Sequence, residues 1–278
     1  MKGLPAPARR VRGLFLASLL AASGMASGHD LWLVSGDYRL RPGESTRVFI
    51  NNGDAFPESL TLLTEPRVLE LRRRGPDGES RVSEFRVDGK SLTFDFLSSA
   101  SGTHLLALAT RPRRVRLKGE DFEDYLAEEG LSELRELREE RGASDTAAVE
   151  RYQKWAKTFV DVGEQEKPDD ASWLEPAGHP LEIVPLAHPN RVPPGGELRL
   201  RVLFRGEPAA GVPISGARAG GPPREISSST DENGEAVVTL GAPGRWYVKA
   251  IHLIESVEDP EVEWDSYWCT LTLEVAAP

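Results

Sequence analysis

Residues 91–110, SLTFDFLSSASGTHLLALAT, contain two short runs rich in Leu, Phe and Thr, and the residues between them include Ser and Gly. Runs of this length and composition are typical of β-strands. A similar run, STRVFIN, covers residues 45–51. Turn-forming Gly, Pro, Asn and Asp residues bound such runs from Asp30 to about Arg116. Several short strands at this spacing predict a β-sandwich.

Strand-like runs also fill the C-terminal part of the chain. They are LEIVPL, ELRLRVLF, GVPISGARA, EAVVTLG, RWYVKAIHLI and CTLTLEV. Six or seven strands in roughly 95 residues is the size of one immunoglobulin-like or prealbumin-like sandwich. The sequence therefore predicts a mainly β protein with two β-sandwich domains, residues 29–178 and residues 179–278, joined by a polar linker at 163–180.

Residues 119–158 have a different composition, rich in Glu, Leu, Ala and Arg. Three leucines within this segment recur at helical spacing: Leu131, Leu134 and Leu137. We expect two or three short helices inserted in or after the first sandwich, broken at Gly130 and Gly142, with Ser144 and Asp145 able to cap the last one. Their charged residues are most simply a solvated helix face.

The N-terminal residues 1–28 resemble a secretion signal. Four basic residues precede an apolar run at 14–22, and small residues follow as far as Gly28. We therefore expect a periplasmic or otherwise secreted protein, cleaved before His29 or, alternatively, before Ser27. The apolar run is too short to span a bilayer as a mature helix, and no later segment is apolar enough, so the protein is not expected to be membrane-spanning.

Charge and motifs exclude several classes of function. The chain has 34 Lys and Arg against 44 Asp and Glu. Loss of the four basic signal residues leaves 34 − 4 = 30, and 30 − 44 gives a mature net charge of −14. Such a surface repels nucleic acid and attracts cations. The single cysteine, Cys269, is expected to be a buried small hydrophobe. No hydrolase or phosphate-binding motif is present, so we predict that the protein is not an enzyme.

Nine short motifs occur in a recognisable order from His29 to Val275. They are HDLWL, YRLRPGES, NNGDAFP, SGTHLLAL, FEDYLAEEGL, RYQKWAKTFVDVG, PLEIVPLAHPN, STDENGEAVVTLGAPGRWYVKAIH and WDSYWCTLTLEV. In this order they resemble a bacterial exported family of unknown function that is grouped with the substrate-specific components of nickel and cobalt uptake. The resemblance implies a soluble periplasmic protein of two β-rich domains that handles a transition metal, as an accessory and not as a transport pore.

The mature chain offers few nitrogen ligands for such a metal. If His29 is N-terminal, its α-amine and ring nitrogen form a bidentate pair. One further imidazole would complete the three-nitrogen arrangement that suits Cu(II) or Ni(II) and resembles a histidine brace. His104 and His252 lie at strand ends, and each could be either a ligand or a core histidine. The sequence thus predicts a metal site of His29, His104 and His252 for nickel, cobalt or copper, while His179 and His188 are expected to be loop residues.

The sequence therefore leaves two alternative functions open. The first is a periplasmic protein that binds a divalent transition metal and serves a membrane metal-uptake system. The alternative is a non-catalytic interaction module that binds glycan or a membrane-bound partner through its sandwich. Four tryptophans could stack on a sugar, although core packing is the simpler role for them: Trp32, Trp246, Trp264 and Trp268. A third and weaker hypothesis is a copper-dependent oxidase.

Overall fold

The computed structural model describes residues 28–163 and 171–278. The predicted signal peptide, residues 1–28, lies outside the described residues except for Gly28. In chain order the elements are β1 Asp30–Ser35, β2 Arg39–Leu40, β3 Ser45–Gly53, η1 Glu65–Arg67, β4 Val68–Gly75, β5 Gly78–Arg81, β6 Arg86–Asp88, β7 Ser91–Leu97, β8 Gly102–Thr110, β9 Arg113–Leu117, α1 Gly119–Glu128, α2 Ser132–Glu140, β10 Ala148–Val162, η2 Ser172–Leu174, β11 Leu181–Pro185, η3 Pro189–Arg191, β12 Gly196–Phe204, β13 Glu207–Pro208, β14 Pro213–Arg218, β15 Ile226–Ser229, β16 Glu235–Leu240, β17 Gly244–Glu255 and β18 Trp264–Val275.

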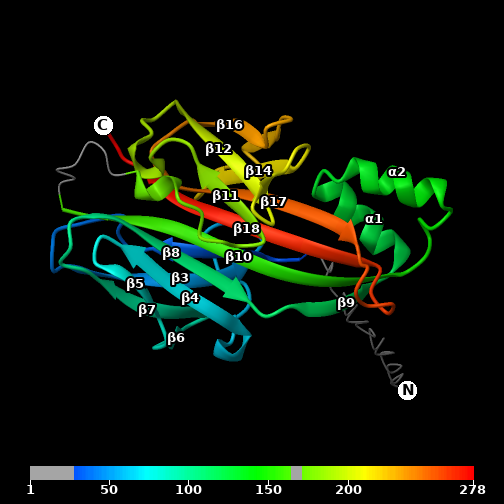
Figure 1. Cartoon of the computed structure of the whole chain (residues 1–278), viewed down its shortest axis with the longest axis horizontal. Helices are drawn as coiled ribbons and strands as arrows, with labels where there is room; N and C mark the ends of the chain where they lie inside the picture. Colours follow the sequence, from blue (N-terminus) through cyan, green and yellow to red (C-terminus); the bar gives the residue numbers. More distant parts are fainter. Residues whose placement is uncertain (1–27, 164–170) are drawn as a thin grey trace, which may run out of the picture.

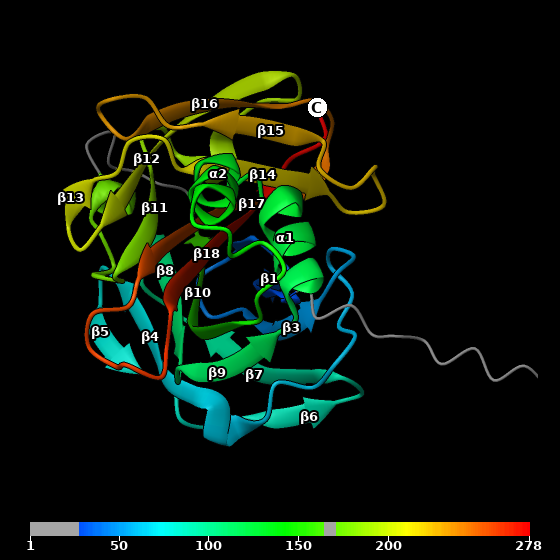
Figure 2. The same cartoon turned by 90° about the vertical axis from the view of Figure 1, so that its right-hand side faces the viewer.

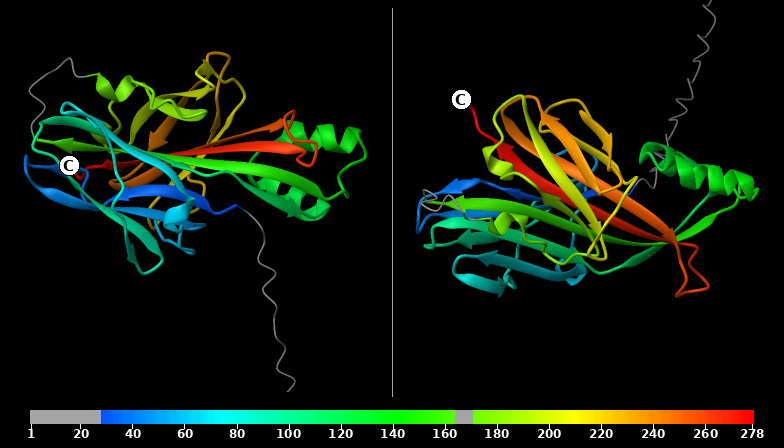
Figure 3. Two further views of the ribbon diagram at one scale, coloured as in Figure 1. Left: turned by 60° about the horizontal axis from the view of Figure 1, so that its bottom comes forward. Right: turned by 45° about the horizontal axis from the view of Figure 1, so that its top comes forward.

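The strands form three sheets. The N-terminal sheet has the order β1-β3-β7-β6. The central sheet has the order β15-β14-β17-β18-β10-β8-β4-β5, with β2 and β9 also paired to β10. The C-terminal sheet contains β11, β12 and β13, and β16 pairs with β12. The long strands β10 and β18 run side by side along the molecule, with the N-terminal sheet on one side of them and the C-terminal sheet on the other (Figures 1 and 3).

The central sheet is buried on both faces, and β8 shows this most clearly because all nine of its residues are buried. Leu106 and Leu108 pack into the core formed with the N-terminal sheet. Leu105 and Ala107, which alternate with them, pack into the core formed with the C-terminal sheet. The prediction of β-sandwich architecture is confirmed, and the two sandwiches share the central sheet between them.

The two halves of the chain meet in the parallel pair of β10 and β18. Residues 150–158 of β10 pair with residues 264–272 of β18. Residues 164–170 of the expected linker lie outside the described residues, but its C-terminal end is tied to this sheet. The buried Glu182 carboxylate accepts Lys157 Nζ at 2.6 Å and the backbone N–H groups of residues 177–179. The polypeptide on either side of residue 178 is therefore joined by main-chain hydrogen bonds and by buried side chains.

Part of the predicted helical segment is a strand. The helices α1 and α2 end as expected near Gly130 and Gly142, whose positive φ angles of 74° and 63° suit glycine. Residues 148–158, expected to be the last helix, instead belong to β10. Trp155 and Phe159 face one core, and Ala156 and Val160 face the other, so pairing with neighbouring strands overrides the helical composition of the segment.

The helices cover one end of the central sheet. Phe122, Tyr125 and Leu126 of α1 pack with Trp264 and Trp268 of β18. Figure 2 looks onto this end of the molecule, with α1 and α2 in front. No helix among the described residues has the length and apolar character needed to cross a membrane.

Strand β1 lies at the edge of the N-terminal sheet and is anchored to the central sheet. Thr270 Oγ1 donates a hydrogen bond to the Leu31 carbonyl at 2.5 Å, and Thr272 Oγ1 donates to the Leu33 carbonyl. These two bonds satisfy carbonyls that an edge strand would otherwise leave unpaired. They also fix the position of the residues just before β1.

Candidate functional site

His29 lies beside Asp54 at the start of β1. Asp30 pairs with Gly53 in the antiparallel ladder of β1 and β3, so the next pair outward is His29 with Asp54. His29 Nδ1 lies 2.6 Å from Asp54 Oδ1, and Nδ1–H donates because an ionised carboxylate only accepts. The two side chains are 30% and 53% exposed. The backbone is also held, because Lys154 Nζ donates to the His29 carbonyl.

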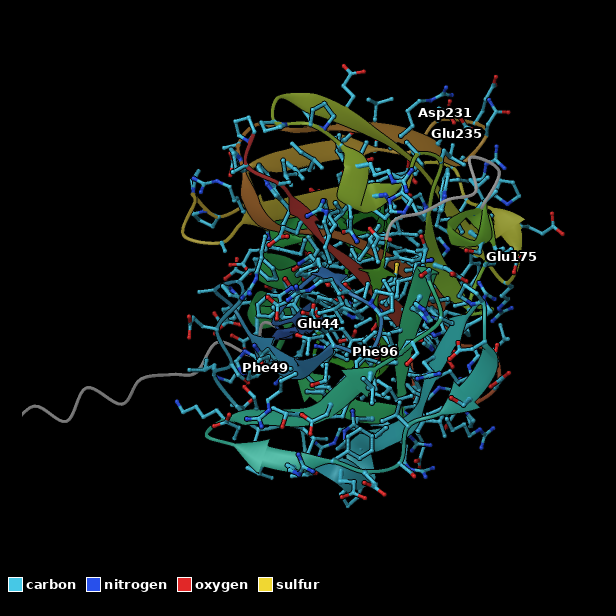
Figure 4. The ribbon with its side chains drawn as sticks, turned by 90° about the vertical axis from the view of Figure 1, so that its left-hand side faces the viewer. Glu44, Phe49, Phe96, Glu175, Asp231 and Glu235 are labelled. Atoms are coloured by element: carbon cyan, nitrogen blue, oxygen red, sulfur yellow. The ribbon has the colours of Figure 1, made fainter. Side chains whose placement is uncertain are left out.

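His104 lies elsewhere, inside the first sandwich. Its ring is fully buried and meets Phe96, labelled in Figure 4, edge to face with 5.4 Å between ring centroids. Its Nε2 bonds to the carbonyl oxygen of Ala100 at 2.9 Å. His104 pairs with Val160 of β10, six positions from Lys154, which corresponds to about 20 Å along the strand. His104 therefore does not reach His29.

His252 lies on the other face of the central sheet. It pairs with Tyr267 of β18, whose side chain points away from the face that carries Trp268. Its ring packs edge-on against Phe204 at 4.6 Å. Burial, and then the charge of Arg205, lower the pKa of His252. The structure therefore does not bring His29, His104 and His252 together. About 20 Å along β10 separates His104 from His29, and His252 lies on the opposite face of the central sheet. Across residues 28–163 and 171–278, no three His, Cys, Asp or Glu side chains are placed to hold a metal.

The remaining candidates are buried. His179 and His188 lie between elements, as expected, yet they are only 7% and 8% exposed. Burial lowers the pKa of His179 to about 4. His188 Nε2 lies 3.2 Å from Asp161 Oδ1. Cys269 is buried as expected, and so are all four tryptophans considered as sugar platforms, since none of them is more than 4% exposed.

A pocket of about 590 Å³ opens beside His29, between the N-terminal sheet and α1. Its floor is one face of β10, where Glu150, Tyr152 and Lys154 occupy alternate positions. Trp268 of β18 lies opposite Lys154, and Arg113 of β9 lies opposite Tyr152. This floor could not be predicted from the sequence. The alternation at positions 150–154 was the available signal, but the helical composition of the segment concealed it.

The pocket floor carries unusual charges. Lys154 is only 7% exposed, and burial lowers its pKa to about 8. Its ammonium lies 4.7 Å from the centre of the Trp268 ring, where a cation is attracted to the aromatic face. Burial raises the pKa of Glu150, although Ser266 Oγ and Tyr125 Oη donate hydrogen bonds to its carboxylate.

Next to the pocket, a second buried lysine, Lys249, forms ion pairs with two carboxylates. Lys249 Nζ lies 2.8 Å from Glu129 Oε2 and 3.1 Å from Asp30 Oδ1. Burial opposes its charge, but these two carboxylates raise the pKa of Lys249 above its usual range. Asp30 therefore serves a structural ion pair, while the neighbouring His29 bonds to Asp54 and lines the pocket.

Comparison with known proteins identifies a family for the chain, and the description of that family states no function. The family model described as "Domain of unknown function (DUF4198)" matches residues 26–254. This agrees with the expected family of unknown function, and the description names neither nickel nor cobalt. No curated protein matches the chain.

Several solved β-domain structures resemble the chain weakly. The D0-D1 domain of intimin is 13% identical, with 90% of this chain and 100% of that chain covered and a TM-score of 0.25. The adhesin InvE of Yersinia pseudotuberculosis is 11% identical, with 88% and 60% covered and a TM-score of 0.24. The fibronectin(III)-like modules of CbhA from Clostridium thermocellum are 10% identical, with 88% and 94% covered and a TM-score of 0.21. Similarity at this level carries no information about function.

Proposed function

The chain belongs to the DUF4198 family, and from that premise we propose that it is an exported protein that binds a divalent transition metal at its mature N-terminus. One observation supports this above the others, namely the distance of 2.6 Å between His29 Nδ1 and Asp54 Oδ1. Two cis ligands that each lie about 2.0 Å from one ion stand about 2.8 Å apart. A small opening of this pair would admit a metal ion.

Signal cleavage before His29 supplies the third ligand. The new α-amine and Nδ1 of the same residue would close a six-membered chelate ring, and the Asp54 carboxylate would add an oxygen. Metal binding would displace the proton that Nδ1 now shares with Asp54. Nitrogen and oxygen donors in a planar arrangement favour Cu(II), with Ni(II) next and Co(II) weaker. The negative net charge of the protein would raise the local concentration of cations.

Cleavage before Ser27 would also create a chelating terminus, with a different ligand set. In the sequence Ser27-Gly28-His29, the α-amine, two peptide nitrogens and the imidazole can form a square-planar site for Cu(II) or Ni(II). That site would not use Asp54, because four nitrogens complete the plane. The effect of an Asp54 substitution therefore distinguishes the two forms.

The test is calorimetric titration of CuCl₂ and NiCl₂ into the chain that begins at His29. We expect one equivalent of Cu(II) to bind. Asp54→Asn should weaken binding about tenfold, and His29→Ala about 100-fold, or about 2.7 kcal/mol. The matched control is a chain that begins at Met25, which keeps the folded residues but moves the amine four residues away. Equal Cu(II) affinity of the chains that begin at Met25 and His29 would contradict the proposal.

The proposed biological role is an accessory that holds the ion for a membrane uptake system. The alternative role, a non-catalytic interaction module, agrees with the sandwich architecture. A glycan would need a surface other than Trp32, Trp246, Trp264 and Trp268, since all four are buried. Binding of a partner that persists in excess EDTA would favour this alternative over the metal role.

A further inference from the structure

The central sheet contains three buried lysines, Lys154, Lys157 and Lys249, whose charged partners differ. Lys157 Nζ has the Glu182 carboxylate at 2.6 Å, and Lys249 Nζ has carboxylates of two residues within 3.1 Å. Lys154 is also buried, but its side chain donates to the His29 carbonyl, and no ion pair among the described residues includes it. Burial lowers the pKa of the Lys154 ammonium to about 8 and outweighs the charges of Asp30 and Glu150, which attract it from a greater distance. A buried ammonium without a carboxylate in direct contact is costly.

The other cations of the pocket are likewise not matched by carboxylates. Arg67 Nη1 donates to the carbonyls of Arg111 at 2.6 Å and Pro112 at 3.4 Å. Arg113 takes part in no ion pair among residues 28–163 and 171–278, whereas its neighbour Arg114 lies 3.3 Å from Glu261 on the other side of β9. The pocket lining thus carries three cations, Lys154, Arg67 and Arg113, against one carboxylate, Glu150, in a protein whose net charge is −10.

From this juxtaposition we propose that the pocket binds a small organic carboxylate, with its anionic group at Lys154, Arg67 and Arg113. Such an anion would give Lys154 the direct ion pair that it lacks among the described residues, and charge-assisted hydrogen bonds to arginine suit the two oxygens of a carboxylate. The proposal goes beyond the metal function and does not depend on it.

The side chains that line the pocket indicate that the carboxylate ligand also carries an apolar group. Leu31, Leu63 and Val115 line it together with the rings of Tyr152 and Trp268. A volume of about 590 Å³ is in the usual range for sites that hold small organic ligands. Inorganic phosphate would pair with the cations but would leave these walls uncovered, so a hydrocarbon or aromatic carboxylate fits the lining better.

The test uses the mature chain in EDTA, so that failure of metal binding does not affect it. Benzoate and hexanoate are titrated by calorimetry, with benzamide as the uncharged analogue of benzoate and sodium phosphate as the inorganic anion. We expect at least one carboxylate to bind at least tenfold more tightly than either benzamide or phosphate. No binding of either carboxylate up to about 10 mM, or equal binding of phosphate, overturns the proposal.

Two adjacent arginines give a matched pair of variants. Arg113→Gln changes an exposed residue of the pocket and should weaken carboxylate binding about tenfold. Arg114→Gln changes the next residue of β9, which faces away, and should leave binding unchanged. Lys154→Met should weaken binding further. Equal affinity of the Arg113→Gln and Arg114→Gln variants, with both folded by circular dichroism, contradicts the assigned position of the anion.

Discussion

Removing a buried lysine from the central sheet should cost more stability when that lysine is paired with a carboxylate. Lys157→Met would leave Glu182 buried without its cation, and such a loss costs about 3–5 kcal/mol. Lys154→Met would remove an ammonium that has no carboxylate partner, and should cost less than about 1 kcal/mol. Urea unfolding of both variants measures the difference. Equal destabilisation by the two substitutions would contradict the role given to Glu182.

Glu150 makes stability depend on pH in the region of the pocket. Burial raises its pKa above that of an unfolded chain. The folded state therefore binds the proton more tightly, and the stabilisation this gives at low pH is lost as pH rises through the folded pKa. Glu150→Gln keeps an acceptor for Ser266 and Tyr125 and has no charge to bury. We expect the stability of the variant, relative to wild type, to increase between pH 4 and pH 8 in urea titrations. A difference that is independent of pH would exclude this effect.

At the level of elements, the attachment of β1 depends on two threonine hydroxyls. Thr270→Val keeps the shape of the side chain but removes the donor to the Leu31 carbonyl, which leaves a backbone acceptor unsatisfied. We expect a loss of about 1–2 kcal/mol in the free energy of unfolding. Thr270→Ser, which keeps the hydroxyl, is the control and should lose less. A Thr270→Val variant as stable as wild type would show that another donor reaches this carbonyl.

The elements also show which part of the fold could be predicted from local sequence. The runs at 91–110 and at 45–51 are strands because their composition and their pairing favour the same state. Residues 148–158 contain good helix formers such as Ala, Glu, Gln and Lys, and only their pairing with β18 and β9 makes them a strand. Such pairing connects distant parts of the chain, so the local pattern could not reveal it.

The same limit applies to the site. His29 could be singled out because its place after a predicted signal peptide and its own side chain are local properties. Asp54 could not, because its position beside His29 depends on the register of β1 and β3. His104 and His252 are predicted as ligands only from their positions at strand ends. The alternation of side chains across the sheet, together with the positions of their pairing partners, places them in separate environments.

At the scale of the whole molecule, the shared central sheet should make the two halves depend on each other. A fragment of residues 29–178 would lack β18 and would expose the face of β10 that carries Trp155 and Phe159. We expect this fragment to show no cooperative thermal transition by circular dichroism, and we expect a chain of residues 29–278 to unfold in one transition. A cooperative transition of the fragment would instead establish residues 29–178 as an independent domain.

The parallel pair of β10 and β18 also bears on the order of folding. Arg151 and Asp265, which form an ion pair across these strands, are 114 positions apart in the chain. Contacts of this separation close large loops, and chains dominated by them fold slowly. Until β18 has been synthesised, residues 150–158 of β10 lack their parallel partner strand, and the apolar side chains that β18 and the C-terminal sheet would cover stay exposed. A nascent chain of this protein should therefore need protection from aggregation for longer than one with local pairing.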